Sequence, residues 1–97
     1  MTEEEAVKLW KEEGIAHIDF IFDCGGDSMG NTEYIAYDSS ENELFRDDGY
    51  NSNRSLIQFI DDDIYRQVEF YVNSDGEYMG EQGTVYITLE DDTILYS

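Results

Sequence analysis

The sequence predicts an α+β fold made of tandem pseudo-symmetric α-β-β(-β) repeats, in which an antiparallel sheet of about four to six strands is covered by two helices. The main observation is that segment 18–30 reappears as segment 68–80, at a constant offset of 50 residues. Identical residues occupy the paired positions Phe20 and Phe70, Gly26 and Gly76, Met29 and Met79, and Gly30 and Gly80. Self-similarity at a fixed offset indicates an internal repeat.

The apolar positions of two helical segments repeat at the same offset. Ala6, Val7, Leu9 and Trp10 fall on Leu56, Ile57, Phe59 and Ile60. Tight polar turns between strands predict antiparallel pairing, and one amphipathic helix per copy predicts helices on one face of the sheet. The two copies, residues 2–45 and 52–96, are expected to form a single domain over residues 1–97.

The first copy is expected to begin with a helix over residues 3–13. Thr2 and Glu5 have the spacing of a capping box, and Gly14 is suited to end the helix. From His17 the apolar period changes to two, which predicts a half-buried strand with Ile18 and its alternate neighbours inward. Turn-forming residues over 23–31 predict a reversal, followed by strands at 33–38 and 43–45. Residues 46–53 are expected to be a polar linker.

The second copy is expected to begin with a helix over residues 54–63, capped by Ser52 or Asn53. The acidic run 61–63 then falls at the helix C-terminus, where carboxylates oppose the helix dipole. These acids are therefore not expected to serve helix stability. Strands are predicted at 67–72, 84–89 and 93–96, with a turn over 73–83.

Composition predicts a folded protein of the reducing cytoplasm. The hydrophobic fraction is 40% and the aromatic fraction 14%, which separates the chain from acidic disordered tails. Cys24 is the single cysteine, so no intramolecular disulfide forms. No segment approaches the apolar length of a membrane helix, and the acidic N-terminus is unlike that of a signal peptide.

The net charge is the most informative functional feature. Five Lys and Arg stand against 24 Asp and Glu, a formal charge of −19. Solubility of a small domain asks for a net charge of only about 2–8 in magnitude, so a selected use of the excess is expected. Such a surface repels nucleic acid and anionic membranes and steers basic proteins toward it.

The repeated glycine loops offer an alternative function, a cation-binding or carboxylate-dependent module. Asn73, Asp75 and Glu77 alternate beside Gly76, as oxygen ligands do in calcium loops. The spacing does not match an EF-hand, because Thr84 stands where a bidentate Glu is required. A glycine-bearing hairpin turn explains the same residues, so no metal or cofactor is predicted.

The residues that invite a catalytic interpretation do not form a catalytic pattern. Cys24 and His17 lack an orienting partner and oxyanion donors, and the second copy has Ser74 and Gln67 in their places. Asp27 and Glu77 occupy equivalent loops, but no pattern fixes their separation for acid–base chemistry. The protein is therefore predicted not to be an enzyme.

In size and composition, with acidic runs at 61–63 and 90–92 among Tyr and Phe, the chain resembles small acidic phage or mobile-element proteins that mimic DNA and block restriction or CRISPR effector proteins. The segment 22–28 also resembles Gly-Asp-Ser loops of small phage-borne proteins. The resemblance implies a non-enzymatic inhibitor or decoy. Its partner would be a basic nucleic-acid-binding protein such as a defence nuclease, with no direct binding of nucleic acid.

Acidic clusters and exposed tyrosines are the predicted partner-binding residues. The carboxylates would replace phosphates and steer the encounter, while tyrosines would supply the energy that holds the complex. The predicted residues are Asp47, Asp48, Tyr50, Asp61, Asp62, Asp63, Tyr65, Tyr78, Glu90, Asp91 and Asp92.

Overall fold

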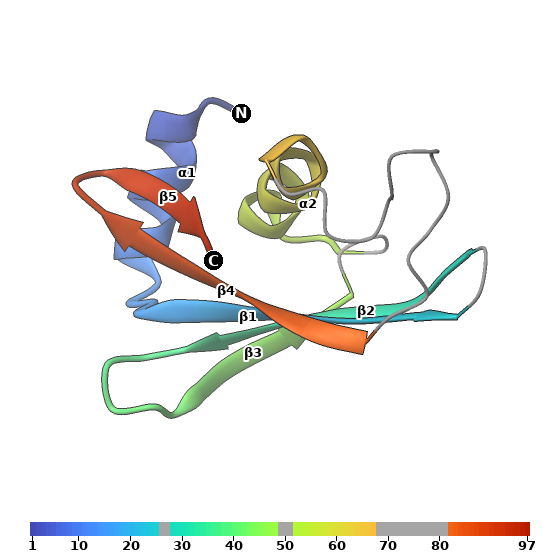
Figure 1. The fold of residues 1–97 in the computed structure, drawn as a ribbon. Coiled ribbons are helices and arrows are strands. Elements are labelled where there is room, and N and C mark those ends of the chain that lie inside the picture. Colours follow the sequence, from blue (N-terminus) through green and yellow to red (C-terminus); the bar gives the residue numbers. More distant parts are fainter. Residues whose placement is uncertain (26–27, 49–51, 68–81) are drawn as a thin grey trace.

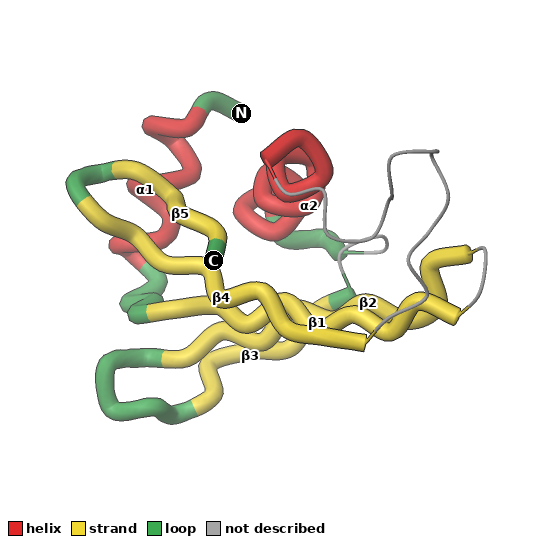
Figure 2. Tube along the Cα trace, in the orientation of Figure 1, coloured by secondary structure: helices red, strands yellow, loops and turns green. Residues whose placement is uncertain are grey.

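Two helices lie on one face of a five-stranded antiparallel sheet (Figures 1 and 2). The computed structural model describes residues 1–25, 28–48, 52–67 and 82–97. The strand order is β3-β2-β1-β4-β5, so the first strand of the chain is central. The elements are α1 (Glu3–Glu12), β1 (His17–Gly25), β2 (Ser28–Tyr37), β3 (Glu43–Asp47), α2 (Ser55–Gln67), β4 (Gln82–Glu90) and β5 (Thr93–Tyr96). The predicted α+β class, with two helices over an antiparallel sheet, is confirmed.

The start and end of α1 follow the local sequence signals. The Glu5 backbone N–H donates to Thr2 Oγ1 at 3.3 Å, and the Thr2 backbone N–H donates to Glu5 Oε1 at 3.3 Å. This is the predicted capping box, which satisfies amide groups that have no partner within the helix. Gly14 has a φ of +70°, a left-handed conformation that glycine adopts without penalty, and the helix ends before it.

The central strand β1 alternates as predicted. Ile18, Phe20 and Phe22 are buried, whereas Ile21 lies on the opposite face and is exposed. The β1–β2 reversal is narrower than the predicted turn over 23–31, because β1 continues to Gly25 and β2 begins at Ser28. The ladder shifts register between Asp23 and Cys24, which accommodates the turn-forming residues within the strand.

The connection from β2 to β3 is organised by Asp38. Its Oδ1 accepts hydrogen bonds from the backbone N–H groups of Ser40 and Asn42, both at 2.9 Å. This side-chain-to-backbone bonding is the typical means by which Asp stabilises a turn. β3 then runs to Asp47, so the expected linker over 46–53 is wrong at its start: Arg46 and Asp47 are paired with β2.

The predicted end of the second helix is wrong. α2 continues to Gln67 instead of ending at residue 63, because Ile64 extends the buried stripe of Leu56, Ile57 and Ile60 by one further turn. The strand predicted to begin at Gln67 therefore does not begin there. Ser52 lies before the helix as expected, where its Oγ accepts the Arg54 backbone N–H at 3.0 Å.

The β4–β5 hairpin has a two-residue turn at Asp91 and Asp92. Glu90 pairs with Thr93 across it, and the two turn residues have φ values of 52° and 58°. Positive φ at both central positions is typical of a type I′ turn, whose twist matches that of the flanking strands. β5 spans Thr93–Tyr96, as predicted, and the hairpin rises beside α1 (Figure 1).

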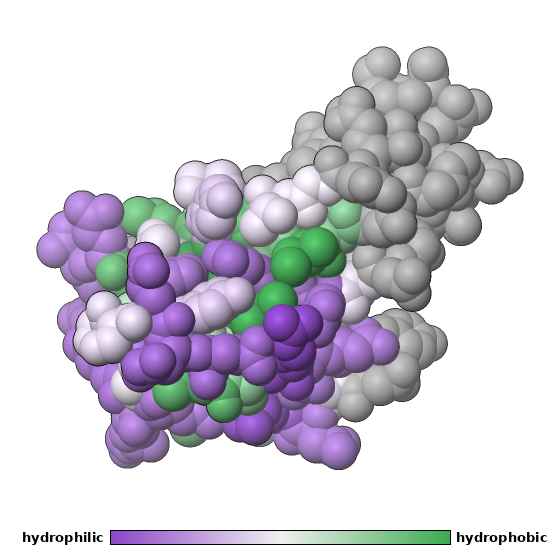
Figure 3. All heavy atoms as spheres, turned by 90° about the horizontal axis from the view of Figure 1, so that it is seen from below, coloured by the Kyte–Doolittle hydropathy of each residue, from purple (hydrophilic) through white to green (hydrophobic). Residues whose placement is uncertain are grey.

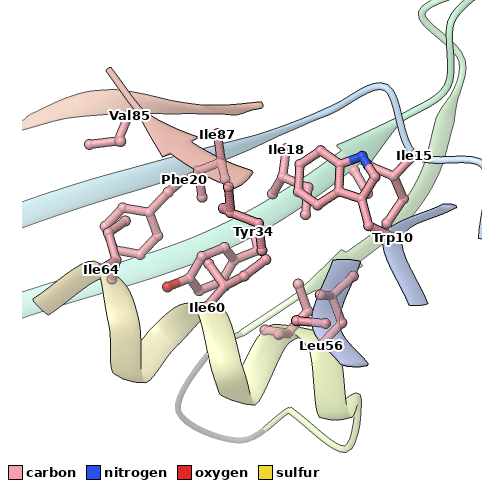
Figure 4. Packing of buried hydrophobic residues seen from close by; sticks show 14 of the residues in the cluster. Trp10, Ile15, Ile18, Phe20, Tyr34, Leu56, Ile60, Ile64, Val85 and Ile87 are labelled. Carbon is pink, nitrogen blue, oxygen red and sulfur yellow. The ribbon is translucent and has the colours of Figure 1, made fainter. Parts of the chain in front are cut away.

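The core lies between the helices and the inner face of the sheet (Figure 4). Trp10 of α1 is 2% exposed, and Phe20 and Tyr34 of the sheet are fully buried. The Phe20 and Tyr34 rings lie 4.7 Å apart, within the range of favourable aromatic pairs. Each large apolar side chain buried in this way contributes about 1.5–3 kcal/mol relative to an exposed one.

The described elements occupy corresponding places in the two predicted copies. Shifted by 50 residues, α1, β2 and β3 overlap α2, β4 and β5. The β2–β3 and β4–β5 pairs also flank β1 on opposite sides. The expected counterpart of β1, with Met79, lies outside the described residues, so the internal repeat stays a prediction.

Candidate protein-binding surface

The basic side chains are neutralised within the chain. Four of the five Lys and Arg have described side chains, and each of these four lies within ion-pair distance of at least one carboxylate: Lys8 with Glu12, Lys11 with Asp92, Arg46 with Glu33 and Glu43, and Arg54 with Glu13 and Asp47. No basic patch is left in this part of the chain. The surplus carboxylates therefore determine the sign of the surface field.

The predicted cluster Asp61, Asp62 and Asp63 is not a uniform anionic patch. Because α2 extends beyond it, these acids lie in the middle of the helix and not at its C-terminus. The Tyr34 hydroxyl donates to Asp61 Oδ1 at 2.8 Å, and the Tyr96 hydroxyl donates to Asp63 Oδ2 at 2.8 Å. Two of the three carboxylates thus attach α2 to β2 and β5, while Asp62 is exposed.

The environment of Asp61 differs from that of a surface acid. Partial burial raises its pKa above the ordinary value, and the hydrogen bond from Tyr34 acts in the opposite direction. The nearby charges of Asp62 and Asp48 also raise this pKa. Asp61 therefore has a structural role as the acceptor for a buried hydroxyl group.

The predicted pair Asp47 and Asp48 lies at the end of β3, before α2. Asp47 Oδ2 accepts a hydrogen bond from Ser52 Oγ at 2.6 Å and lies 3.5 Å from Arg54 Nε. The Arg54 guanidinium also lies 3.9 Å from the centroid of the Phe45 ring. This arginine is thus held by a carboxylate and an aromatic face together.

The predicted cluster at the β4–β5 turn is the most exposed of the three. Glu90, Asp91 and Asp92 are all exposed, and Asp92 is paired with Lys11 of α1. Glu90 is the last residue of β4, and Asp91 is the first residue of the two-residue turn. This turn and Asp62 carry described carboxylates that are available to steer a basic partner.

The predicted tyrosine anchors are not tested by the structure. Tyr50 and Tyr78 lie outside the described residues, and only the backbone of Tyr65 is described, within α2. The alternative metal ligands Asn73, Asp75 and Glu77 also lie outside the described residues. Within the described ranges, no group of three or more His, Cys, Asp or Glu side chains is arranged to hold a metal ion.

The structure adds a surface that sequence reasoning did not identify as a site: the face of the sheet opposite the helices. Side chains from all five strands contribute to it, and several are apolar or aromatic. The exposed ones include Ile21 at 38%, Leu44 at 40%, Leu95 at 40% and Tyr86 at 56%. We call this the open face. In the view from below, apolar patches lie among hydrophilic residues (Figure 3).

The open face also contains a close aromatic pair. The His17 and Tyr37 rings, on neighbouring strands β1 and β2, are stacked with centroids 4.8 Å apart. Ile35, next along this face of β2, is only 3% exposed although it lies outside the main core. The sequence signal was present, because Tyr86 alternates with the buried residues Val85 and Ile87, but alternation alone does not say which face the helices cover.

A hollow of about 570 Å³ lies between α1 and the β4–β5 turn and is bounded by charged side chains. Its lining is Glu3, Glu4, Val7, Lys8, Lys11 and Asp92. Both lysines are already paired with carboxylates, Lys8 with Glu12 and Lys11 with Asp92.

Comparisons with known proteins give no match to this chain, whether with family models, curated proteins or solved structures. Neither α1 nor α2 has the length and apolar character needed to cross a membrane.

Proposed function

We propose that this protein is a non-enzymatic acidic binding protein that inhibits or sequesters a basic nucleic-acid-binding protein, in the manner of a DNA-mimic anti-defence inhibitor. The observation that carries the proposal is the formal charge of −19, combined with ion pairing of every basic side chain that the structure describes. A surface of this kind attracts a groove lined by Lys and Arg and repels nucleic acid itself.

Steering and holding are separate tasks in such a complex. Exposed carboxylates at Asp62, Glu90 and Asp91 supply the long-range field that accelerates encounter. Affinity also requires a contact that excludes water, and aromatic and aliphatic side chains contribute most of its energy. The open face, with Tyr86 exposed, provides such a contact in the described part of the chain.

The partner class follows from what the carboxylates would replace. A defence nuclease binds nucleic acid through Lys and Arg, and the phosphates that these side chains neutralise release their bound counterions. The carboxylates of this protein would take the place of the phosphates, and salt screens their attraction to Lys and Arg, so binding would weaken as salt rises. Occupation of the groove by protein carboxylates inhibits without any cofactor or chemical step.

A competition titration tests the proposal. The partner is captured on the immobilised protein from a nuclease-treated lysate, purified, and titrated with labelled duplex DNA or RNA at low and high salt. We expect the protein to displace the nucleic acid competitively, and the apparent affinity of the protein to fall with rising salt. Simultaneous saturating binding of the protein and the nucleic acid to the partner would refute the proposal.

A further inference from the structure

The middle of the open face contains an acidic group with an unused acceptor. Asp19 lies on the central strand β1, between Ile35 of β2 and Tyr86 of β4 in the sheet register. Its side chain is 20% exposed, and its Oδ1 atom is buried yet receives no hydrogen bond from any described residue. His17 Nε2 lies 3.8 Å from that oxygen, which is too far for a hydrogen bond.

An unused acceptor of this kind is uncommon in a folded protein. Buried polar atoms are nearly always hydrogen-bonded, and a carboxylate oxygen withdrawn from water without a donor is unfavourable. A cation that contacts the exposed part of this carboxylate from outside the chain would compensate its negative charge. A cationic donor would do so best, because charge-assisted hydrogen bonds are the strong ones.

Tyr86 provides a second element of a cation site beside Asp19. The two residues are directly opposite on β1 and β4, so their Cβ atoms are expected about 4.5–5.5 Å apart on the same face. Tyr86 is 56% exposed, and its backbone exchanges two hydrogen bonds of 2.9 Å with Ser97. Its ring is therefore accessible on a fixed backbone, as a cation–π contact requires.

The same chain contains an occupied site of this composition. On the other side of the sheet, Arg54 lies 3.9 Å from the Phe45 ring centroid and 3.5 Å from Asp47 Oδ2. An arginine between an aromatic ring and an aspartate is thus an arrangement that this protein already uses. Asp19 and Tyr86 supply the same two groups, an aspartate and an aromatic ring. The arginines whose side chains are described, Arg46 and Arg54, pair with other carboxylates.

We propose that the open face binds an arginine side chain of a basic partner, with the guanidinium donating to the exposed part of the Asp19 carboxylate and lying over the Tyr86 ring. This inference rests on the proposed function, which supplies the basic partner, and it identifies where that partner is held. Arginine is favoured over lysine because its planar guanidinium can stack on a ring while donating to a carboxylate. Ile21 and Leu95 provide apolar surface at the edge of the contact.

A second copy of this chain is a poor occupant of the site. Two molecules of charge −19 repel one another, and the two arginines whose side chains are described, Arg46 and Arg54, are already engaged with carboxylates of their own chain. A basic partner has neither disadvantage. Charge complementarity therefore selects a cationic protein segment over self-association.

The probe for this site is a nona-arginine peptide, titrated into the full chain at about 50 mM salt, where surface charges are only partly screened. Amide NMR spectra should show the largest shifts on β1 and β4, around Asp19 and Tyr86. We expect Tyr86→Ala and Asp19→Asn each to weaken binding about tenfold, as truncation of a central contact does. Tyr86→Phe, which keeps the ring, should bind within about twofold of the wild type.

The matched control is Glu4→Gln, which removes an equal charge from the exposed surface of α1 and should weaken binding less than about twofold. Nona-lysine should bind more weakly than nona-arginine. Dispersed amide spectra confirm that each variant is folded, and Tyr86→Ala still tests the site if Asp19→Asn does not fold.

Three outcomes would overturn the inference, and they are distinguishable. Shifts spread over all acidic segments, with equal effects of Asp19→Asn and Glu4→Gln, would remove the open-face site and leave the proposed function standing. A dimer in light scattering that Tyr86→Ala dissociates would assign the face to self-association. Absence of nona-arginine binding even at low salt would contradict the proposed function itself.

Discussion

Tyr34 and Tyr86 lie on opposite faces of the same sheet, and they differ in burial and in the contacts of their side chains. Tyr34 is fully buried beneath the helices, and its hydroxyl donates to Asp61 of α2 at 2.8 Å. Tyr86 is 56% exposed on the open face. One tyrosine uses its ring and its hydroxyl to hold the fold together, whereas the ring of the other is presented to solvent.

The carboxylates beside these tyrosines repeat the contrast. Asp61 receives the Tyr34 hydroxyl, but Asp19, opposite Tyr86, has a buried oxygen with no donor among the described residues. On the covered side, the Asp61 carboxylate thus receives its hydrogen bond from within the chain. On the open face, the buried oxygen of Asp19 receives none from the described residues. This unsatisfied, aromatic face of a strongly acidic protein is the surface that we propose for contact with a cationic partner.

The largest expected difference between the faces is in stability. Ile60→Ala on the covered side removes a fully buried side chain and should destabilise the protein by about 2–5 kcal/mol, since the core cannot close the cavity completely. Ile21→Ala, the matched change on the open face, should cost less than about 1 kcal/mol. Denaturant unfolding measures both, and equal losses would mean that the open face is also part of the core.

Substitution of Gly83 on β4 should have the next largest effect on stability. The Phe22 ring crosses Gly83, where an added Cβ would lie 2.7 Å from Phe22 Cζ. Gly83→Ala must displace a buried aromatic ring and should cost about 1–3 kcal/mol. Thr84→Ala, one residue along and on the other face, should cost less than about 1 kcal/mol. A neutral Gly83→Ala by denaturant unfolding would show that the ring moves freely.

Removing the hydroxyl group should affect stability differently at Tyr34 and at Tyr86. Tyr34→Phe leaves the partly buried Asp61 carboxylate without this donor and should destabilise the protein by about 1–2 kcal/mol. The same change at Tyr86 should alter stability by less than about 0.5 kcal/mol, because its hydroxyl is at the exposed surface. Thermal unfolding of the two variants measures the difference, and an equal loss at Tyr86 would contradict the contrast.

The pH dependence of stability follows from the same contact. Burial raises the pKa of Asp61 above its ordinary 3.8, so the folded state binds this proton more readily than the unfolded chain. The contribution of Asp61 is therefore most favourable below that value and is lost as pH rises through the folded pKa. Tyr34→Phe removes the opposing hydrogen bond and should raise the pKa further. Carboxyl NMR titration measures this shift, and a lowered pKa would contradict the assignment.

Neutralising exposed carboxylates should change stability least. Asp62→Asn combined with Asp91→Asn removes charges that have no described side-chain partner, and stability should rise by less than about 1 kcal/mol at low salt. The gain should disappear in high salt, where repulsion is screened. A loss of stability at low salt would show that these acids make structural contacts.

Calcium provides a test of the alternative function. Millimolar calcium should raise the melting temperature no more than sodium chloride of equal ionic strength, because both relieve repulsion in a chain of charge −19. A saturable micromolar calcium transition, lost in Asp75→Asn with Glu77→Gln, would instead support a cation-binding loop.

Local signals in the sequence predicted much of the fold. The capping box at Thr2 and the two-residue period of β1 act within a few residues, so the sequence carries them directly. The predicted end of α2 at residue 63 is wrong because the acidic run 61–63 resembles the end of a helix. Tyr34 and Tyr96 satisfy two of those acids from distant strands, which no local pattern reveals.

The candidate site was harder to predict for the same reason. Asp19 and Tyr86 are 67 positions apart, and only the β1–β4 pairing makes them neighbours. The alternation of apolar and polar residues along each strand is evident from the sequence. Which face of the sheet the helices leave uncovered depends on the packing of the whole chain. Charge was evident from composition, whereas the surface that would hold a partner required the topology.

We propose that surface charge steers the partner toward the protein and that contacts on the open face slow its dissociation. The most direct test is the measurement of association and dissociation rates for the captured partner at two salt concentrations. Asp62→Asn combined with Glu90→Gln and Asp91→Asn should slow association and flatten its salt dependence, with dissociation nearly unchanged. Tyr86→Ala should accelerate dissociation by about tenfold and leave association nearly unchanged. If both variants alter only the association rate, or if Tyr86→Ala alters neither rate, the account is contradicted.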